Sequence, residues 1–201
     1  SDVYKRQSIG RAYVTVFRKL RVGVFFSGDE LVQPGEPLHP GGIYNSNRFM
    51  VRSILQLLGC EVTDLGSVPD SLEATKRAFE HAAETSDVIL TTGGMSVGEE
   101  DHIKPAVEAL GRIDLWRVKL KPGKPLAFGE VKDVPFVGLP GNPVSGFVVL
   151  LMMARPFLLR RMGLKEVDLT PMKIRADFDW LKVGDREEFV RVRRNAEGGL
   201  D

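Results

Sequence analysis

The alternation of apolar and polar segments along the chain predicts strands and helices that follow one another in turn. Short apolar runs at 21–26 and 87–92 indicate buried strands, because runs of this length bounded by turn residues are typical of a covered sheet. The segment 60–68 indicates a further strand. Between these strands, apolar residues recur at helical spacing over 45–59 and 71–85. The first part of the chain therefore predicts the order strand, helix, strand, helix, strand.

The second part continues this order. It predicts a short helix over about 103–110 and three strand-like pieces, "IDLWRVKL", "PLAFGEV" and "PFVGL". An apolar helix follows over about 143–162, and we expect a kink at Pro156, because proline lacks the N–H that a helix interior needs. Alternating strands and helices are typical of a parallel sheet covered on both faces. We therefore predict a three-layer α/β domain over 20–165, with a mostly parallel sheet and helices on both faces.

Polar residues mark the expected starts of three helices. An Asn-Ser pair precedes the helix at 45–59. Asp70 stands three residues before Glu73, the spacing of a capping box. Asn142 followed by Pro143 is the combination preferred at the cap and first position of a helix.

The two ends of the chain differ from the α/β pattern. After about Glu166, "PMKIRADF" and "EEFVRVRR" predict short strands with no helix between them. We interpret 168–201 as part of a β-rich, barrel-like second domain. The opening residues 1–19 have neither strand nor helix periodicity, and we interpret them as a non-native or linker segment.

Composition narrows the possible partners. The chain has 201 residues, 43% of them hydrophobic, and a formal net charge of +1, so no overall field favours nucleic acid or an anionic membrane. The longest uncharged apolar run, 147–154, is far shorter than the roughly 20 residues of a membrane span. The single cysteine, Cys60, excludes an intrachain disulfide and is typical of a reducing compartment. We expect a cytoplasmic protein with no nucleic-acid or membrane partner.

Four unusual loops each follow a predicted strand. They are "SGDE" at 27–30, "TTGGMSVGEED" at 91–101, "KPGKP" at 121–125 and "LPGNPVS" at 139–145. Because ligands of an open parallel sheet bind at the carboxyl ends of its strands, we expect these loops to line one cleft. Glycines and helix starts expose backbone N–H groups to an anion, and lysines add positive charge. Carboxylates beside a phosphate site are typical of Mg²⁺, so the pattern predicts a phosphate or oxyanion site with this metal.

Each loop also has a purely structural interpretation. The glycine pair at 93–94 suits a simple turn, and the lysines of "KPGKP" suit a solvated turn. Glu30 and Asp101 could be surface or helix-capping carboxylates, and "LPGNPVS" could be an ordinary strand-to-helix turn. The loops contain no Walker or Rossmann fingerprint, and the three histidines lack the spacing of metal ligands. The argument for a site depends on the four loops meeting at one edge.

Five motifs in order resemble a known family. "SGDELVQPGEPL", "YNSNRF", "GGMSVGEEDHIK", "KLKPGKPLAFG" and "GLPGNPVS" make the chain over about 20–163 similar to the molybdopterin molybdenumtransferases of the MoeA and gephyrin E-domain type. "REEFVRVRR" resembles the start of that family's C-terminal β-barrel domain. The resemblance implies a Mg²⁺-dependent insertion of molybdate into adenylylated molybdopterin, with release of AMP. It also implies a homodimer in the full-length protein.

The resemblance carries roles to individual positions. Asp101, Glu30 and Asp70 match acidic positions and are the catalytic candidates. Asp101 and Glu30 are also the candidates for Mg²⁺, and for Asp70 helix capping is an equal rival. Residues implied for molybdate are Lys124, Pro125 and Arg186. Residues implied for molybdopterin and its phosphate are Ser27, Gly28, Gly93, Gly94, Ser96, Gly98, Lys121, Gly123, Lys124, Pro140, Gly141, Asn142, Pro143 and Ser145.

The chain also departs from the family pattern. Asn45 stands where many members have aspartate, and Arg117 stands where some have lysine. The family's two N-terminal domains have no counterpart in these residues, so we expect the chain alone to turn over weakly or not at all. Two alternatives stay open: a molybdopterin adenylyltransferase, which normally ends after the α/β domain, and a non-catalytic pterin-binding or scaffold module. The sequence does not distinguish molybdate from tungstate, which are oxyanions of nearly equal size.

Overall fold

The structure, a computed structural model, describes residues 5, 10, 12–95, 101–181 and 184–201. Its main element is a six-stranded sheet of order β4–β1–β5–β9–β8–β6. The strands of this sheet are β1 (Arg21–Ser27), β4 (Glu61–Val68), β5 (Val88–Thr92), β6 (Gly111–Trp116), β8 (Ala127–Val131) and β9 (Val134–Leu139).

The central strands run parallel, as the alternating pattern predicts. β1 pairs with both β4 and β5, and β5 pairs with β9, all in parallel register. β8 runs antiparallel to β9, and β6 runs antiparallel to β8. The turn from β8 to β9 holds Lys132 and Asp133 at φ values of 47° and 64°, the backbone that suits a two-residue hairpin. The mostly parallel sheet is therefore confirmed, with two antiparallel pairings at one edge.

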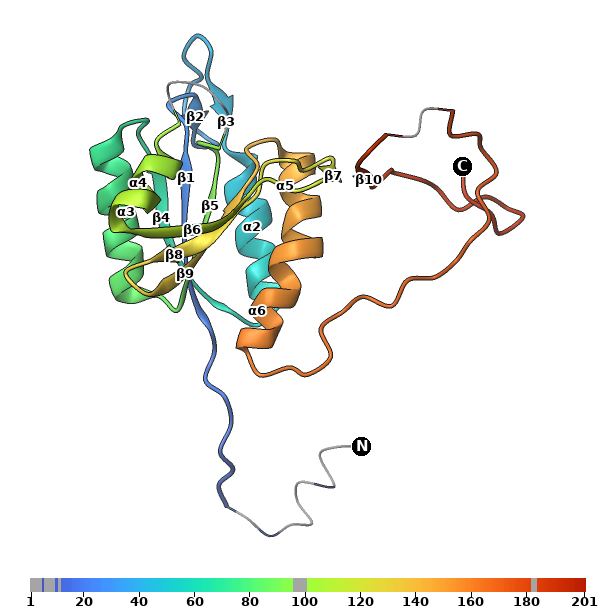
Figure 1. The fold of residues 1–201 in the computed structure, drawn as a ribbon, viewed down its shortest axis with the longest axis horizontal. Helices are drawn as coiled ribbons and strands as arrows, with labels where there is room; N and C mark the ends of the chain where they lie inside the picture. Colours follow the sequence, from blue (N-terminus) through green and yellow to red (C-terminus); the bar gives the residue numbers. More distant parts are fainter. Residues whose placement is uncertain (1–4, 6–9, 11, 96–100, 182–183) are drawn as a thin grey trace.

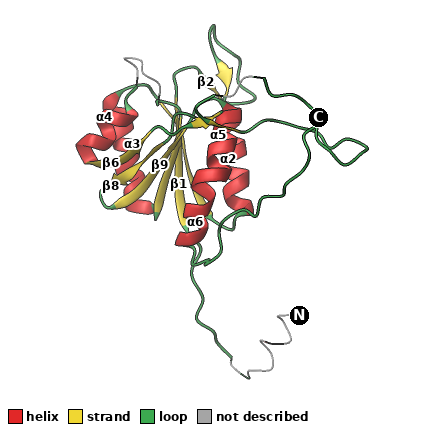
Figure 2. Ribbon diagram, turned by 45° about the vertical axis from the view of Figure 1, so that its right-hand side comes forward, coloured by secondary structure: helices red, strands yellow, loops and turns green. Residues whose placement is uncertain are grey.

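Helices cover both faces of this sheet (Figures 1 and 2). On one face lie α2 (Ser46–Leu57), α5 (Pro143–Val149) and α6 (Arg155–Arg161). On the other face lie α3 (Leu72–Thr85) and α4 (Ile103–Leu110). The predicted three-layer α/β fold is thus confirmed.

Successive residues of β1 supply the two cores on either side of the sheet. Phe26 belongs to the buried cluster that contains Leu55 of α2. Phe25 belongs to the opposite cluster, where its ring meets Phe79 of α3 edge to face at 4.9 Å, and Phe79 meets Phe136 of β9 at 5.1 Å. Such pairs add to the stabilisation from burial itself. Both faces of the sheet are therefore covered, and loops can form a site only at its edges.

Polar caps begin α2 and α3 close to the expected positions. Asn45 accepts a hydrogen bond from a backbone N–H in the first turn of α2 at 3.1 Å, so the cap expected there is confirmed. α3 begins after Ser71, whose Oγ accepts from the Ala74 N–H at 3.2 Å. The capping-box prediction for Asp70 and Glu73 is wrong, because the cap lies one residue later and Asp70 has other partners.

One continuous helix runs from α5 through η1 (Leu150–Ala154), a π-helical segment, into α6. The Arg155 N–H donates to the carbonyl oxygen of Leu150, five residues back, immediately before Pro156. The irregularity expected at this proline is thus a widened turn. Among the described residues, this helix alone is long and apolar enough to cross a membrane by length and composition. That is weak support for a span, since core helices pass the same test and Leu150 is fully buried.

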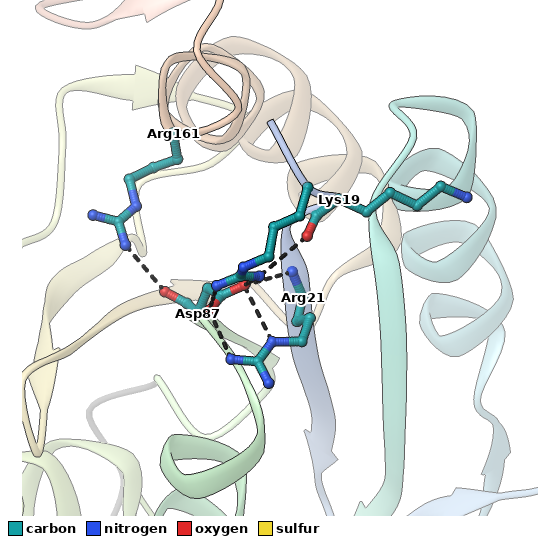
Figure 3. A network of polar contacts seen from close by, with 5 residues as sticks. Lys19, Arg21, Asp87 and Arg161 are labelled. Carbon is teal, nitrogen blue, oxygen red and sulfur yellow. Dashed lines mark hydrogen bonds and ion pairs between the residues drawn. The ribbon is translucent and has the colours of Figure 1, made fainter. Parts of the chain in front are cut away.

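Asp87 ties three segments together at the edge where the parallel strands begin (Figure 3). Its carboxylate accepts from Arg18 at 2.5 and 2.6 Å and from the Arg21 side chain at 2.9 Å. Its carbonyl oxygen accepts from Arg161 at 3.5 Å. The two guanidinium groups, Arg18 first, hold the pKa of Asp87 well below its usual range. Arg18 lies within 1–19, so this end of the expected linker segment is joined to the folded unit.

Two small pairings lie outside the main sheet. β2 (Leu31–Val32) pairs with β3 (Ile43–Tyr44), and β10 (Glu187–Glu188) in the tail pairs with β7 (Leu120–Lys121), both in parallel. In Figure 1 the tail leaves α6, loops outward and returns to β7. The strands predicted in "PMKIRADF" and "EEFVRVRR" are wrong apart from β10 and isolated bridges, because alternation makes a strand only where a neighbour completes the hydrogen bonds. The two-domain division stays a prediction.

Candidate functional site

A cavity of about 630 Å³ opens at the edge of the sheet where β1, β5 and β9 end. It is lined from the loops after β1, β4, β5 and β9 and, from the "KPGKP" loop, by its last proline. The structure thus brings most of the predicted site residues together, although their roles stay predictions. The predicted residues that line it are Ser27, Gly28, Glu30, Asp70, Gly93, Gly94, Asp101, Pro125, Pro140, Gly141, Asn142 and Ser145.

Other predicted site residues lie elsewhere. Arg186 lines a second cavity of about 300 Å³ in the tail, together with Trp180 and Glu188. Ser96 and Gly98 lie outside the described residues. The predicted residues that are described but do not line the first cavity are Lys121, Gly123, Lys124, Pro143 and Arg186.

Glycine at position 93 allows the loops after β1, β5 and β9 to touch. A Cβ on Gly93 would lie 2.1 Å from the carbonyl oxygen of Ser27, and its φ of 87° also disfavours any other residue. On the other side, a Cβ on Gly141 would lie 3.5 Å from the Cα of Gly93. The contact at Gly141 is of ordinary van der Waals length, so the close approach requires glycine at position 93.

Asp70 braces the loop after β1. Its Oδ1 accepts from the Ser27 hydroxyl at 2.8 Å, and its Oδ2 accepts from the Asp29 N–H at 3.1 Å. Asp29 returns the contact by accepting from the Asp70 N–H at 3.0 Å. Both carboxylate oxygens of Asp70 therefore already have donors, which favours a structural role for this residue over a free acid or base.

Asp101 has a different environment. Burial raises the pKa of Asp101 to about 6, opposed by the backbone N–H groups of Ile103 and Lys104 at the start of α4 and, more weakly, by nearby positive charge. Its Oδ1 is buried and has no hydrogen-bond partner among the residues that the structure describes. A buried carboxylate oxygen without a donor is unfavourable unless a cation or a donor from a ligand completes it. Asp101 therefore lines the cavity beside the start of α4, whose N-cap is His102.

Glu30 lies at the same cavity as Asp101. Its carboxylate folds over Gly28, where a Cβ would meet Glu30 Oε2 at 2.5 Å, so glycine makes room for this acidic group. Within the described part of the chain, no group of three or more acidic, histidine or cysteine side chains could hold a metal ion. Mg²⁺, however, usually takes only one or two protein carboxylates and completes its shell with substrate oxygens and water. Asp101 and Glu30, which line the same cavity, fit that mode.

The start of α5 is already satisfied by its own cap. Asn142 Oδ1 accepts from the N–H groups of Val144 and Ser145 at 3.1 and 3.2 Å, and its carbonyl oxygen accepts from the Gly146 N–H at 2.8 Å. Pro143 has no N–H to offer. The contacts therefore favour the strand-to-helix turn over an anion cradle, because an anion would have to displace Asn142 from these donors.

The lysine loop is held from two sides. The Val118 N–H donates to the Lys124 carbonyl oxygen at 3.0 Å, and Gly123 packs so closely that a Cβ would lie 2.5 Å from Val149. Lys121 donates to Glu188 of β10 at 2.6 Å, and this ammonium group is the main cause that lowers the pKa of Glu188. Lys121 is thus half of an ion pair, which the solvated-turn interpretation did not foresee.

Asn47 is a site residue that the sequence analysis missed. It lies in the first turn of α2, is 7% exposed, and lines the cavity. Its Nδ2 donates to the Gly141 carbonyl oxygen at 2.7 Å and to Thr92 Oγ1 at 3.4 Å. Its Oδ1 is buried and has no partner among the described residues. The available signal was a polar residue at a buried position of an amphipathic helix, inside the motif "YNSNRF".

Taken together, the geometry defines an α/β domain covered on both faces, with a cavity at the carboxyl ends of its parallel strands, where ligands of such sheets usually bind. Comparison with known proteins identifies the family of this domain. Residues 23–160 match a family described as "Probable molybdopterin binding domain". The chain belongs to this molybdopterin-binding domain family.

Individual relatives agree with this assignment. Over 159 residues, 79% of the chain, it is 45% identical to a molybdopterin molybdenumtransferase of Haemophilus influenzae. It is 34% identical over 189 residues, 92% of the chain, to the molybdenum cofactor synthesis protein cinnamon of Drosophila melanogaster. A solved molybdopterin biosynthesis MoeA protein of Pyrococcus horikoshii superposes on 73% of the chain with a TM-score of 0.66 at 34% identity. These matches span only 39%, 31% and 36% of the three relatives.

Proposed function

We propose that the cavity binds adenylylated molybdopterin, and that the protein containing this chain inserts molybdate into it with release of AMP. The observation that carries the proposal is Asp101, which lines the cavity and whose buried Oδ1 has no partner among the described residues. The substrate offers a phosphoanhydride, whose oxygens need donors and a cation. The name of the Haemophilus influenzae relative, molybdopterin molybdenumtransferase, supports the transfer of molybdenum to molybdopterin. We further propose a cytoplasmic homodimer for the full protein.

The acidic residues have two different roles in this proposal, metal binding and support of a loop. Asp101 and Glu30 would hold Mg²⁺, which when bound offsets the negative charge of the anhydride oxygens. Asp101 also keeps its carboxylate ionised near neutral pH, since its pKa of about 6 lies below 7. Asp70 keeps the loop after β1 in place through Ser27 and Asp29, and so supports the site without meeting the substrate.

The basic residues would hold the oxyanion ends. Lys124 is exposed beside Pro125, which lines the cavity, so its ammonium group can reach a phosphate or molybdate there. Lys121 pairs with Glu188 of the tail. Arg186 belongs to the tail itself and lines the second cavity. The proposed anion path therefore runs from the cavity along the 121–125 loop to the tail.

Binding of molybdopterin to the 201-residue chain tests the proposal. Lys124→Ala should weaken binding by about tenfold, since one charge-assisted contact contributes about 1–2 kcal/mol. Lys165→Ala is the control, because this exposed lysine lies after α6 and lines neither cavity. A chain that does not bind molybdopterin contradicts the proposal. Equal binding by Lys124→Ala and the control variant would assign Lys124 to a solvated turn.

A further inference from the structure

Lys121 and Lys124 differ in their partners. Lys121 Nζ lies 2.6 Å from Glu188 Oε1, whereas Lys124 has no acidic side chain within 4.0 Å among the residues that the structure describes. The two halves of the pair also differ in exposure, because the Glu188 side chain is 13% exposed and the Lys121 side chain 51%. The carboxylate is thus fixed within the protein, while the ammonium group faces outward.

The position of Glu188 does not depend on the ion pair. On either side of it, the Glu187 N–H donates to the Lys119 carbonyl oxygen at 3.0 Å, and the Phe189 N–H donates to the Lys121 carbonyl oxygen at 2.7 Å. The side chain of Phe189 packs against the main core. Backbone pairing and apolar contact therefore place Glu188 beside β7. The carboxylate of Glu188 then orients the side chain of Lys121.

The backbone of the loop is also fixed, which leaves the lysine side chain as its mobile part. Where the loop begins and ends, the Arg117 N–H donates to the Leu126 carbonyl oxygen at 2.7 Å, and the Val118 N–H donates to the Lys124 carbonyl oxygen at 3.0 Å. Gly123 is wedged against Val149 below. A long lysine side chain loses rotamer freedom when it binds an anion, and one that is already held loses less.

We propose that Glu188 is a positioning residue, which holds Lys121 so that its remaining N–H groups face a tetrahedral oxyanion bound at the 121–125 loop. An ammonium group has three donors, and the Glu188 contact uses one of them. The inference rests on the proposed function, and it adds that the tail strand β10 takes part in anion binding. Glu188 itself does not touch the anion.

Two substitutions at Glu188 distinguish the effect of its hydrogen bond with Lys121 from the effect of its negative charge. Glu188→Gln keeps an oxygen that can accept from Lys121 but removes the negative charge, so the chain should bind molybdate and phosphate as tightly as the wild type or more tightly. Glu188→Ala removes the acceptor and should weaken binding of both ions by about fivefold to tenfold, because the lysine must then be ordered on binding. The affinities are measured by calorimetric titration with inorganic molybdate and inorganic phosphate.

Double substitution shows whether the effect passes through the lysine. In a Lys121→Ala background, Glu188→Ala should not weaken the affinity further, since interacting positions are not additive. Any remaining change should be a tightening, because the negative charge of Glu188 is removed. Glu80→Ala is the matched control, because Glu80 also forms an ion pair with a lysine, Lys132, at 3.0 Å but lines neither cavity. Melting curves confirm that every variant is folded.

The outcomes separate this inference from the proposed function. If the Glu188→Ala variant is folded and binds either ion at least as tightly as the wild type, the positioning role is overturned. If Lys124→Ala loses binding while Glu188→Ala retains it, the proposed function stands and the inference fails. If the wild-type chain binds molybdopterin but neither ion, the inference fails and the proposed function stands; if it binds neither molybdopterin nor the ions, both fail.

Discussion

Asn47 on α2 donates from Nδ2 to the carbonyl oxygen of Gly141 at 2.7 Å, and so joins the first turn of a helix to the loop that follows β9. The two residues are far apart in the sequence, and both line the cavity. The same amide contacts Thr92 at the end of β5. One side chain therefore links α2 to the ends of two neighbouring strands. Its Oδ1 accepts no hydrogen bond from the described residues.

Asn47→Ala should lower the free energy of unfolding by about 1–3 kcal/mol, because it removes a buried donor and leaves the Gly141 carbonyl unpaired. It should also weaken molybdopterin binding, since the loop after β9 loses its tie to α2. Gln56→Ala on the same helix is the control, because Gln56 is exposed and should change stability by less than about 0.5 kcal/mol. Urea unfolding of both variants checks the difference, and equal stabilities would show that the Asn47 bond contributes nothing.

Gly93→Ala and Gly66→Ala test the close approach of the loops. Both glycines have positive φ, 87° and 79°, but only Gly93 has an atom in the way of a Cβ. Gly66→Ala should therefore cost about 1 kcal/mol from backbone conformation alone. Gly93→Ala should cost about 3 kcal/mol or more, because it also drives a methyl group into the Ser27 carbonyl. A similar loss for both variants in thermal unfolding would mean that the contact with Ser27 is not required.

Asp101 makes stability depend on pH in a defined direction. Because burial raises its pKa in the folded protein to about 6, the folded state binds this proton more tightly than the unfolded chain does. The folded state therefore loses stability as the pH rises from about 4, the usual carboxyl range, through about 6. Asp101→Asn removes this effect, so Tm of the variant minus Tm of the wild type should grow across that window and then level off.

Melting curves between pH 4 and pH 8 without added metal check this expectation. Asp114→Asn, which changes an exposed aspartate of β6, provides the control. A Tm difference that stays constant with pH, or that shrinks as the pH rises, contradicts the assigned environment of Asp101.

Local patterns in the sequence predict most of the fold for identifiable reasons. The strands and helices were readable because alternating and helical spacing reflect which side chains the cores bury, as with Phe25 and Phe26 of β1. The caps at Asn45 and Asn142 were readable because they depend on residues within one turn. Asp70 misled the analysis because its partners, Ser27 and Asp29, are distant in sequence.

The site was predictable only at the level of loops. The rule that ligands bind at the carboxyl ends of parallel strands placed the loops after β1, β5 and β9 at one cavity. It could not show that Asn142 occupies the N–H groups of α5, that Asn47 joins two loops, or that Lys121 pairs with Glu188. Each of these depends on the direction of a side chain, which spacing along the chain does not determine.

Molybdate-dependent release of AMP by an Asp101→Asn variant is the most direct test of the proposed function. The host is a chimera in which residues 20–163 replace the matching segment of the Haemophilus influenzae relative, which is 45% identical over 159 residues. If Asp101 helps hold Mg²⁺, the variant should still bind molybdopterin but release AMP more slowly by a factor on the order of 100, as for loss of a key electrostatic group. Asp114→Asn in the same chimera should leave the rate unchanged. If Asp101→Asn releases AMP at the rate of the unsubstituted chimera, Asp101 serves only as a helix cap and the proposed metal site is contradicted.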